Sequence, residues 1–150
     1  MKKLINTFLF LVVSSAAYPT VAYSHCQIPC GIYDDHARVK SMLEDVATTR
    51  KSVKLIIELS AKPDAQSKNQ LIRWVMNKER HAQNIISTIG DYFLTQRVKS
   101  KQKDYMERLK KHHAVIVTAM KVKQNASMEH VNNLEASIKE LLPYYLEHKH

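Results

Sequence analysis

Glycine is nearly absent from this chain, which contains only Gly31 and Gly90 among its 150 residues. Alternating apolar and polar runs bounded by turn residues, which would predict strands, are weak throughout. Internal repeats, low-complexity tracts and a composition shift that would mark a second domain are also lacking. These absences argue against a β-rich or repeat protein and favour one small helical domain.

A hydrophobic run long enough to cross a membrane, which takes about 20 residues, is missing as well. The apolar stretch at residues 4–13 is short, contains two polar residues and follows two lysines, and Ala22 and Ser24 supply small residues further on. This three-part pattern predicts a secretory signal peptide at residues 1–24, cleaved before His25. An uncleaved N-terminal anchor is the alternative. We expect the mature protein to be periplasmic or extracellular, without a membrane segment.

Acidic residues are fewer than basic ones, and the formal net charge is +9. Cleavage of the leader would remove two of the lysines, and the rest recur at helical spacing along the whole chain. A nucleic-acid-binding protein would carry a basic stripe with interleaved aromatics or a known binding module. Neither is present, so we expect no nucleic-acid partner.

Apolar residues recur at spacings of three and four along the remainder of the chain, which predicts amphipathic helices. Four helices with short connections indicate an all-α, antiparallel up-down four-helix bundle at residues 34–150. Gly90 is expected to end the second helix and Pro143 to kink or end the fourth. The helices are expected to start at Asp34 or Asp35 and stop at Lys62-Pro63-Asp64, and then to run from about Gln66 to Ile89, Ser100 to Lys123 and Ser127 to Glu147.

The same spacing predicts which side chains face the core. His113 falls on the apolar stripe of the third helix and is expected to be a core or interface histidine rather than a metal ligand. The predicted inward residues are Val39, Met42, Val46, Val53 and Ile56; Leu71, Trp74, Val75, Ala82, Ile85 and Ile89; Met106, Leu109, His113, Ile116 and Met120; and Met128, Val131, Leu134, Ile138, Leu141 and Tyr145.

The segment after the expected cleavage site, residues 25–33, reads His-Cys-Gln-Ile-Pro-Cys-Gly-Ile-Tyr. With His25 as the first residue, its α-amine and the Cys26 amide nitrogen can chelate one metal. The thiolates of Cys26 and Cys30 complete a set of two nitrogens and two sulfurs. Planar sites of this kind suit nickel(II) or copper(II), whereas zinc prefers a tetrahedron. The His25 imidazole can approach as an axial ligand.

Two other interpretations of these residues stay open. Two cysteines in an exported protein commonly form a disulfide, so Cys26 and Cys30 could staple a helical interaction protein. That interpretation gives no part to His25 or to a free α-amine. The second is a non-catalytic exported metal carrier that uses the same donors and passes its metal to a partner.

The complete string His-Cys-x-x-Pro-Cys-Gly-x-Tyr at residues 25–33 resembles the nickel hook of nickel-dependent superoxide dismutases. Asp91-Tyr92-Phe93 resembles the segment that supplies a second active-site tyrosine in that family. The resemblance implies one nickel ion per subunit, bound by the His25 α-amine and imidazole, the Cys26 amide and thiolate, and the Cys30 thiolate. Tyr33 and Tyr92 would line the path of the superoxide anion and order water there.

The resemblance also implies what the protein does. Nickel would cycle between Ni(II) and Ni(III), oxidising one superoxide to O₂ and reducing another to hydrogen peroxide. The four-helix subunits would assemble as a homohexamer that buries the hooks against neighbouring subunits. The family carries a glutamate early in the first helix and an arginine in the second that orient the axial histidine. Here Lys40 or Ser41 stands at the first position and Asn77 at the second.

Overall fold

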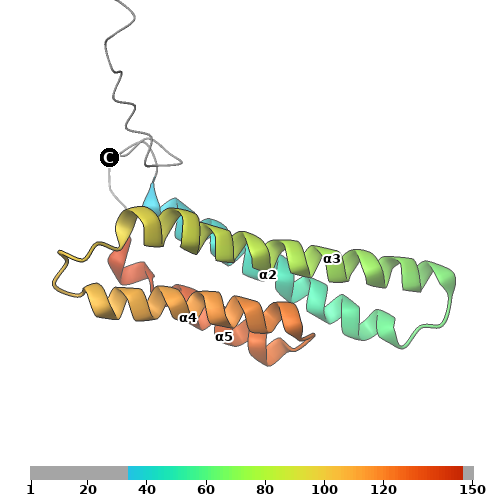
Figure 1. The fold of residues 1–150 in the computed structure, drawn as a ribbon. Helices are drawn as coiled ribbons and strands as arrows, with labels where there is room; N and C mark the ends of the chain where they lie inside the picture. The colour runs from blue at the N-terminus through green and yellow to red at the C-terminus, as the bar shows by residue number, and fades with distance from the viewer. Residues whose placement is uncertain (1–33, 147–150) are drawn as a thin grey trace, which may run out of the picture.

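The computed structural model describes residues 34–146, which form a bundle of four helices without a strand among them (Figure 1). Consecutive helices pack side by side and the last returns to the first, so the bundle is antiparallel and up-down, as predicted. Residues 25–33, the predicted hook, lie outside the described residues. The elements are α2 (Asp35–Ser60), α3 (Ala65–Ser87), the π-helix η1 (Thr88–Arg97), α4 (Tyr105–Gln124), α5 (Met128–Lys139) and the 3₁₀-helix η2 (Leu142–Tyr144).

Aspartates cap the first two helices. The Asp34 side chain accepts hydrogen bonds from the amides of His36 at 2.8 Å and Ala37 at 3.3 Å. Asp64 accepts one from an amide in the first turn of α3 at 2.9 Å. Such caps satisfy amides that have no partner inside the helix. The predicted start of the first helix and its stop before Pro63 are confirmed.

The last two helices are shorter than predicted. α4 begins at Tyr105 rather than near Ser100, because residues 99–104 form turns. α5 ends at Lys139, and the 3₁₀-helix that follows holds Pro143 in its first turn. Proline has no amide to donate and cannot continue an α-helix. The prediction that Pro143 breaks the fourth helix is therefore confirmed.

Gly90 does not end the second helix, and that prediction is wrong. Helical structure passes from α3 into η1 and continues to Arg97. Gly90 does not adopt the left-handed conformation of a helix-ending glycine, and a Cβ added there would meet nothing within 4 Å. Ile89 and Phe93, on either side of it, are fully buried. The helix continues because ending it at Gly90 would withdraw the apolar side chain of Phe93 from the core.

The third helix is rotated relative to the predicted face. Its buried residues are His112, Val115, Ala119 and Val122, whereas the predicted His113 is exposed. Met106 and Met120, also predicted to be buried, are 71% and 44% exposed. This helix carries two apolar stripes one residue apart, so periodicity alone could not choose between them. The predicted inward residues that the structure buries are Val39, Met42, Val46, Val53, Ile56, Ala82, Ile85, Ile89, Val131, Leu134, Ile138, Leu141 and Tyr145.

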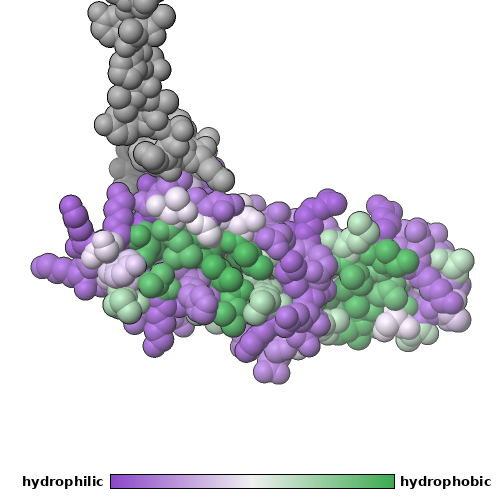
Figure 2. All heavy atoms as spheres, in the orientation of Figure 1, coloured by the Kyte–Doolittle hydropathy of each residue, from purple (hydrophilic) through white to green (hydrophobic). Residues whose placement is uncertain are grey.

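The α2–α3 hairpin projects beyond the ends of α4 and α5 (Figure 1). Figure 2 shows apolar surface over this projecting part. Val75, predicted to face the core, is 39% exposed here, and Ile57, Ile72 and Met76 are each more than half exposed. The prediction for Val75 is wrong because this part of α3 has only α2 to pack against. We call Ile57, Ile72, Val75 and Met76 the hairpin patch.

We expect Gly90→Ala to raise the free energy of unfolding by about 0.5–1 kcal/mol. Alanine loses less backbone entropy on folding than glycine, and the structure leaves room for its methyl group. Urea denaturation followed by circular dichroism measures the change. The matched reverse substitution, Ala82→Gly in the buried face of α3, should lower stability. A destabilised Gly90→Ala protein would contradict the continuous helix described above.

Candidate functional site

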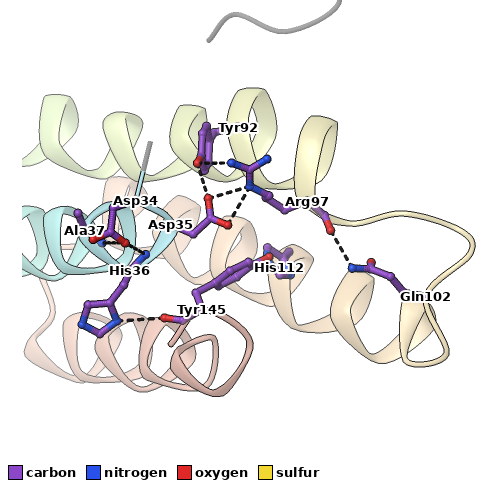
Figure 3. Close-up of polar contacts among 9 residues, drawn as sticks. All are labelled: Asp34, Asp35, His36, Ala37, Tyr92, Arg97, Gln102, His112 and Tyr145. Carbon is purple, nitrogen blue, oxygen red and sulfur yellow. Dashed lines mark hydrogen bonds and ion pairs between the residues drawn. The ribbon is translucent and has the colours of Figure 1, made fainter. Parts of the chain in front are cut away.

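Most residues predicted for the site lie outside the described part of the chain: this holds for His25, Cys26, Cys30 and Tyr33. The structure does describe Tyr92, which lies in η1 and is only 5% exposed. Its hydroxyl faces the first turn of α2, where the chain enters the bundle (Figure 3). The described part of the predicted site is therefore the surroundings of Tyr92.

The π-helical conformation of η1 brings two neighbouring aromatic rings into the bundle. Tyr92 and Phe93 are both buried, and their rings meet edge to face with centroids 5.0 Å apart. The Val98 amide donates to the Phe93 carbonyl at 3.0 Å, and the Thr95 hydroxyl donates to the Gly90 carbonyl at 2.8 Å. A π-helix has a wider turn than an α-helix, and such turns recur at functional sites.

Asp35, Tyr92 and Arg97 form a closed polar cluster (Figure 3). Arg97 Nε donates to both carboxylate oxygens of Asp35, at 2.7 and 2.8 Å, and Arg97 Nη2 donates to the Tyr92 hydroxyl at 2.9 Å. The Tyr92 hydroxyl in turn donates to Asp35 Oδ1. The Arg97 guanidinium also lies 5.0 Å from the centre of the Tyr92 ring. We call these three residues the Tyr92 cluster.

Contacts on both sides hold the Tyr92 cluster in place. His36, next to Asp35, forms a hydrogen bond between Nδ1 and the Tyr145 carbonyl at 3.0 Å. Gln102 Nε2 donates to the Arg97 carbonyl at 3.1 Å. The first turn of α2 is thereby joined to the residue that follows η2, and the end of η1 to the turns before α4 (Figure 3).

A buried aromatic group lies behind the Tyr92 cluster. The Phe93 ring centroid is 4.5 Å from that of Tyr145 and 5.7 Å from that of His112. His112 forms hydrogen bonds through both ring nitrogens, from Nδ1 to the Arg108 carbonyl at 2.7 Å and from Nε2 to the Tyr145 hydroxyl at 2.8 Å. Because a carbonyl only accepts, Nδ1 carries the proton and the Tyr145 hydroxyl donates to Nε2.

Burial shifts the pKa values of these groups toward their neutral forms. The pKa of Tyr92 is raised, first by burial and then by the hydrogen bond to Asp35 and its negative charge, while Arg97 opposes the rise. Burial likewise raises the pKa of Tyr145. The pKa of His112 is lowered, chiefly by burial. Both tyrosines are therefore phenols and His112 is a neutral imidazole near neutral pH.

The described residues contain no group of three or more His, Cys, Asp or Glu side chains placed to hold a metal ion. None of the helices they form is long and apolar enough to cross a membrane. In comparisons with known proteins, the family model of nickel-containing superoxide dismutase matches residues 20–149. The chain belongs to this family. It is therefore an oxidoreductase that contains nickel and disproportionates superoxide.

No curated protein and no solved structure matches the enzyme significantly. The family match includes residues 25–33 as well as the helices, so the resemblance drawn from the hook extends over nearly the whole chain. Membership of an enzyme family also favours the dismutase over the carrier and disulfide interpretations of Cys26 and Cys30.

Sequence reasoning missed two members of the Tyr92 cluster. The sequence predicts Asp35 only as one of two alternative helix caps and assigns no role to Arg97. They lie far apart in the chain, and neither belongs to a motif. Asp35 does stand two residues after Tyr33, the end of the predicted hook. That proximity is the one feature of the sequence that could have pointed to Asp35 as a residue near the predicted site.

The residues at the family's histidine-orienting positions make other contacts here. Asn77 Nδ2 donates to the Ser52 hydroxyl at 3.1 Å, which joins α3 to α2. Lys40 and Ser41 are exposed on α2. Among the described residues, the polar side chains at the first turn of α2, where the chain enters the bundle, include Asp35 and the groups that bond to it.

We expect the enzyme to lose stability in acid partly through His112. Because its folded-state pKa is lowered, the unfolded chain binds the proton more readily. The stability that depends on neutral His112 is complete above its unfolded-state pKa of about 6.5 and is lost as the pH falls through the lower folded-state value. Urea denaturation should show that the free energy of unfolding falls less between pH 7.5 and pH 5 for His112→Gln than for the wild type.

The exposed neighbour supplies the matched control for this experiment. His113→Gln removes an imidazole from the same helix without touching the core. Its free energy of unfolding should fall as much between pH 7.5 and pH 5 as that of the wild type. Equal pH dependence of the His112→Gln and His113→Gln proteins would exclude the buried imidazole as the cause.

Proposed function

We propose that the enzyme binds its nickel through residues 25–33 after cleavage before His25. The observation that carries the proposal is the family match, which includes this segment, together with the composition of the chain. Cys26 and Cys30 are its only cysteines, so thiolate ligands can come from no other position. The described residues supply no competing group of ligands.

The donors of this segment fit nickel. The ligands would be the α-amine and imidazole of His25, the amide nitrogen and thiolate of Cys26, and the thiolate of Cys30. Mixed nitrogen and sulfur donors in a plane suit nickel(II), whereas oxygen donors suit harder cations. When bound, nickel would supply one-electron chemistry by cycling between Ni(II) and Ni(III), which converts two superoxide anions and two protons to O₂ and hydrogen peroxide.

The bundle would provide the surroundings of the hook. Asp34 caps α2 directly after Tyr33, so the hook joins the bundle at the end where Tyr92 lies. We assign Tyr33 and Tyr92 to the path of superoxide, where they exclude bulk water and orient the molecules that enter. Tyr92 is suited to this task because its phenol stays protonated and is held by Asp35 and Arg97.

Export would create one of the ligands. The α-amine of His25 exists only after the chain is cut after Ser24, and residues 1–24 have the pattern of a signal peptide. The family match begins at residue 20, so most of this leader lies outside the region shared with the family. We therefore place the mature enzyme in the periplasm or outside the cell.

Assembly of subunits is proposed from the hairpin patch. Monomeric proteins rarely leave a contiguous apolar patch of this kind uncovered. Ile72 and Met76 are each 60% exposed, one turn apart on α3. We propose that the patch is covered by other copies of the chain, in the homohexamer that the family resemblance implies.

The first test concerns the free α-amine. One extra residue before His25 should abolish both nickel binding and dismutase activity and leave the helices intact, because it converts the amine into an amide. Nickel is measured by elemental analysis, activity by a superoxide dismutation assay and folding by circular dichroism. An extended enzyme with full activity would refute the proposed ligand set.

Single substitutions separate the ligands from one another. Cys26→Ser and Cys30→Ser should each lose nickel together with activity. His25→Ala keeps the α-amine and both thiolates, so it should retain part of its nickel and lose most of its turnover. The intact mass of the purified wild type, which must correspond to a start at His25, is the control for processing.

The second test concerns assembly. Ile72→Glu and Met76→Glu should dissociate the oligomer, because they place charges in an apolar interface. Sedimentation velocity measures the mass and circular dichroism the fold. Met106→Glu introduces the same charge at a methionine of α4 that is 71% exposed, and it should leave the assembly intact. A monomeric wild type would contradict the hexamer without affecting the proposed nickel site.

A further inference from the structure

The donor and the acceptor of each hydrogen bond in the Tyr92 cluster can be assigned in only one way. A carboxylate accepts and a guanidinium donates, so each can bond to the phenol in just one way. The single proton of Tyr92 points to Asp35, and one lone pair of its oxygen receives the N–H of Arg97. As far as the described residues go, one lone pair of the phenol remains, and no proton.

The charges around Tyr92 reinforce this assignment. Asp35 reaches it from α2 and Arg97 from η1, and the two form an ion pair with each other. The Arg38 guanidinium, also from α2, lies 5.8 Å from the ring centre. Phe93 covers another side of the ring without adding charge. Asp35 is therefore the one anion facing the hydroxyl among the described residues.

Solvent reaches the cluster through its charged members. The side chains of Arg97 and Asp35 are 21% and 25% exposed, while Tyr92 is 5% exposed. Partial burial strengthens the hydrogen bonds between these groups relative to those of a fully solvated pair. The phenol is thus held by groups that are themselves anchored, at the edge of the bundle.

We propose that Asp35 and Arg97 are positioning residues that hold the Tyr92 hydroxyl in one orientation, so that it meets small molecules at this end of the bundle as a hydrogen-bond acceptor only. The inference rests on the proposed part of Tyr92 in the dismutase reaction. It adds that Tyr92 accepts hydrogen bonds from these molecules and does not donate to them, because the phenol proton is already donated to Asp35.

This restriction distinguishes the substrate from the product. Superoxide is an anion without a proton to donate, so a phenol that can only accept does not bind it. Water and hydrogen peroxide carry O–H groups and can donate to the free lone pair. Tyr92 accordingly orders water or the peroxide product, and attraction of the anion falls to the positive groups of the protein.

The test follows the pKa of Tyr92 in the mature, nickel-loaded enzyme. Nuclear magnetic resonance of ¹³C-labelled tyrosine reports the ionisation of each ring, and Tyr92→Phe identifies the signal. In Asp35→Asn the pKa of Tyr92 should fall, because the charge that raises it is gone while Arg97 remains. In Arg97→Gln it should rise further, because the opposing cation is lost.

Asp104→Asn is the matched control. Asp104 accepts from Arg108 Nε through both oxygens at 2.9 Å, as Asp35 does from Arg97. The substitution removes an equivalent carboxylate outside the cluster and should leave the pKa of Tyr92 unchanged. Shifts in the same direction for Asp35→Asn and Arg97→Gln, or an equal shift for Asp104→Asn, would overturn the proposal.

Kinetics connect the cluster to turnover. The alkaline limb of the pH profile of kcat/KM should follow the pKa of the Tyr92 phenol. It should move to lower pH in Asp35→Asn and to higher pH in Arg97→Gln. A limb that stays in place while the resonance shifts would also overturn the inference. A nickel-loaded wild type that does not dismute superoxide refutes the proposed function instead, since the resonance experiment reads the cluster independently of activity.

Discussion

The ring of Phe93 is fully buried where three parts of the chain meet. It packs against Tyr92 from its own helix, against His112 from α4 and against Tyr145, which follows η2. Aromatic pairs of this kind add about 0.5–1.5 kcal/mol each beyond the burial of their area. Because Phe93 fixes η1 against the core, its neighbour Tyr92 is turned toward α2. The position of the proposed site therefore depends on this packing.

Electrostatic attraction also connects the helices around Tyr92. The ion pair of Asp35 and Arg97 joins the first turn of α2 to the last turn of η1. A carboxylate at a helix start is favoured by the helix dipole, and both of its oxygens accept from the N–H of Arg97 Nε. The two charges cancel locally. The excess of basic residues that would attract an anion is therefore spread over the rest of the chain.

In the proposed enzyme the metal ligands belong to one segment and the helices to another. The thiols of the chain are in residues 25–33, whereas the bundle contributes a buried aromatic group and the Tyr92 cluster. A metal site built from an N-terminal segment needs little from the helices except a fixed point of attachment and a shaped approach. The Asp34 cap and the contact of His36 with Tyr145 provide such a point.

The sequence by itself determined the four helices, an aspartate cap at Asp34 or Asp35 and the breaks at Pro63 and Pro143, because spacing, capping and proline act within a few residues. It also supplies the donors of residues 25–33 from which the nickel ligands are proposed, since donor types and their order are local properties. Tertiary structure decided that helical structure passes Gly90, because burial of Phe93 outweighs a weak local stop. It selected His112 over His113, since two apolar stripes compete and only packing chooses between them. It alone brought Asp35 to Arg97, because their attraction depends on a distance that the order of residues does not contain.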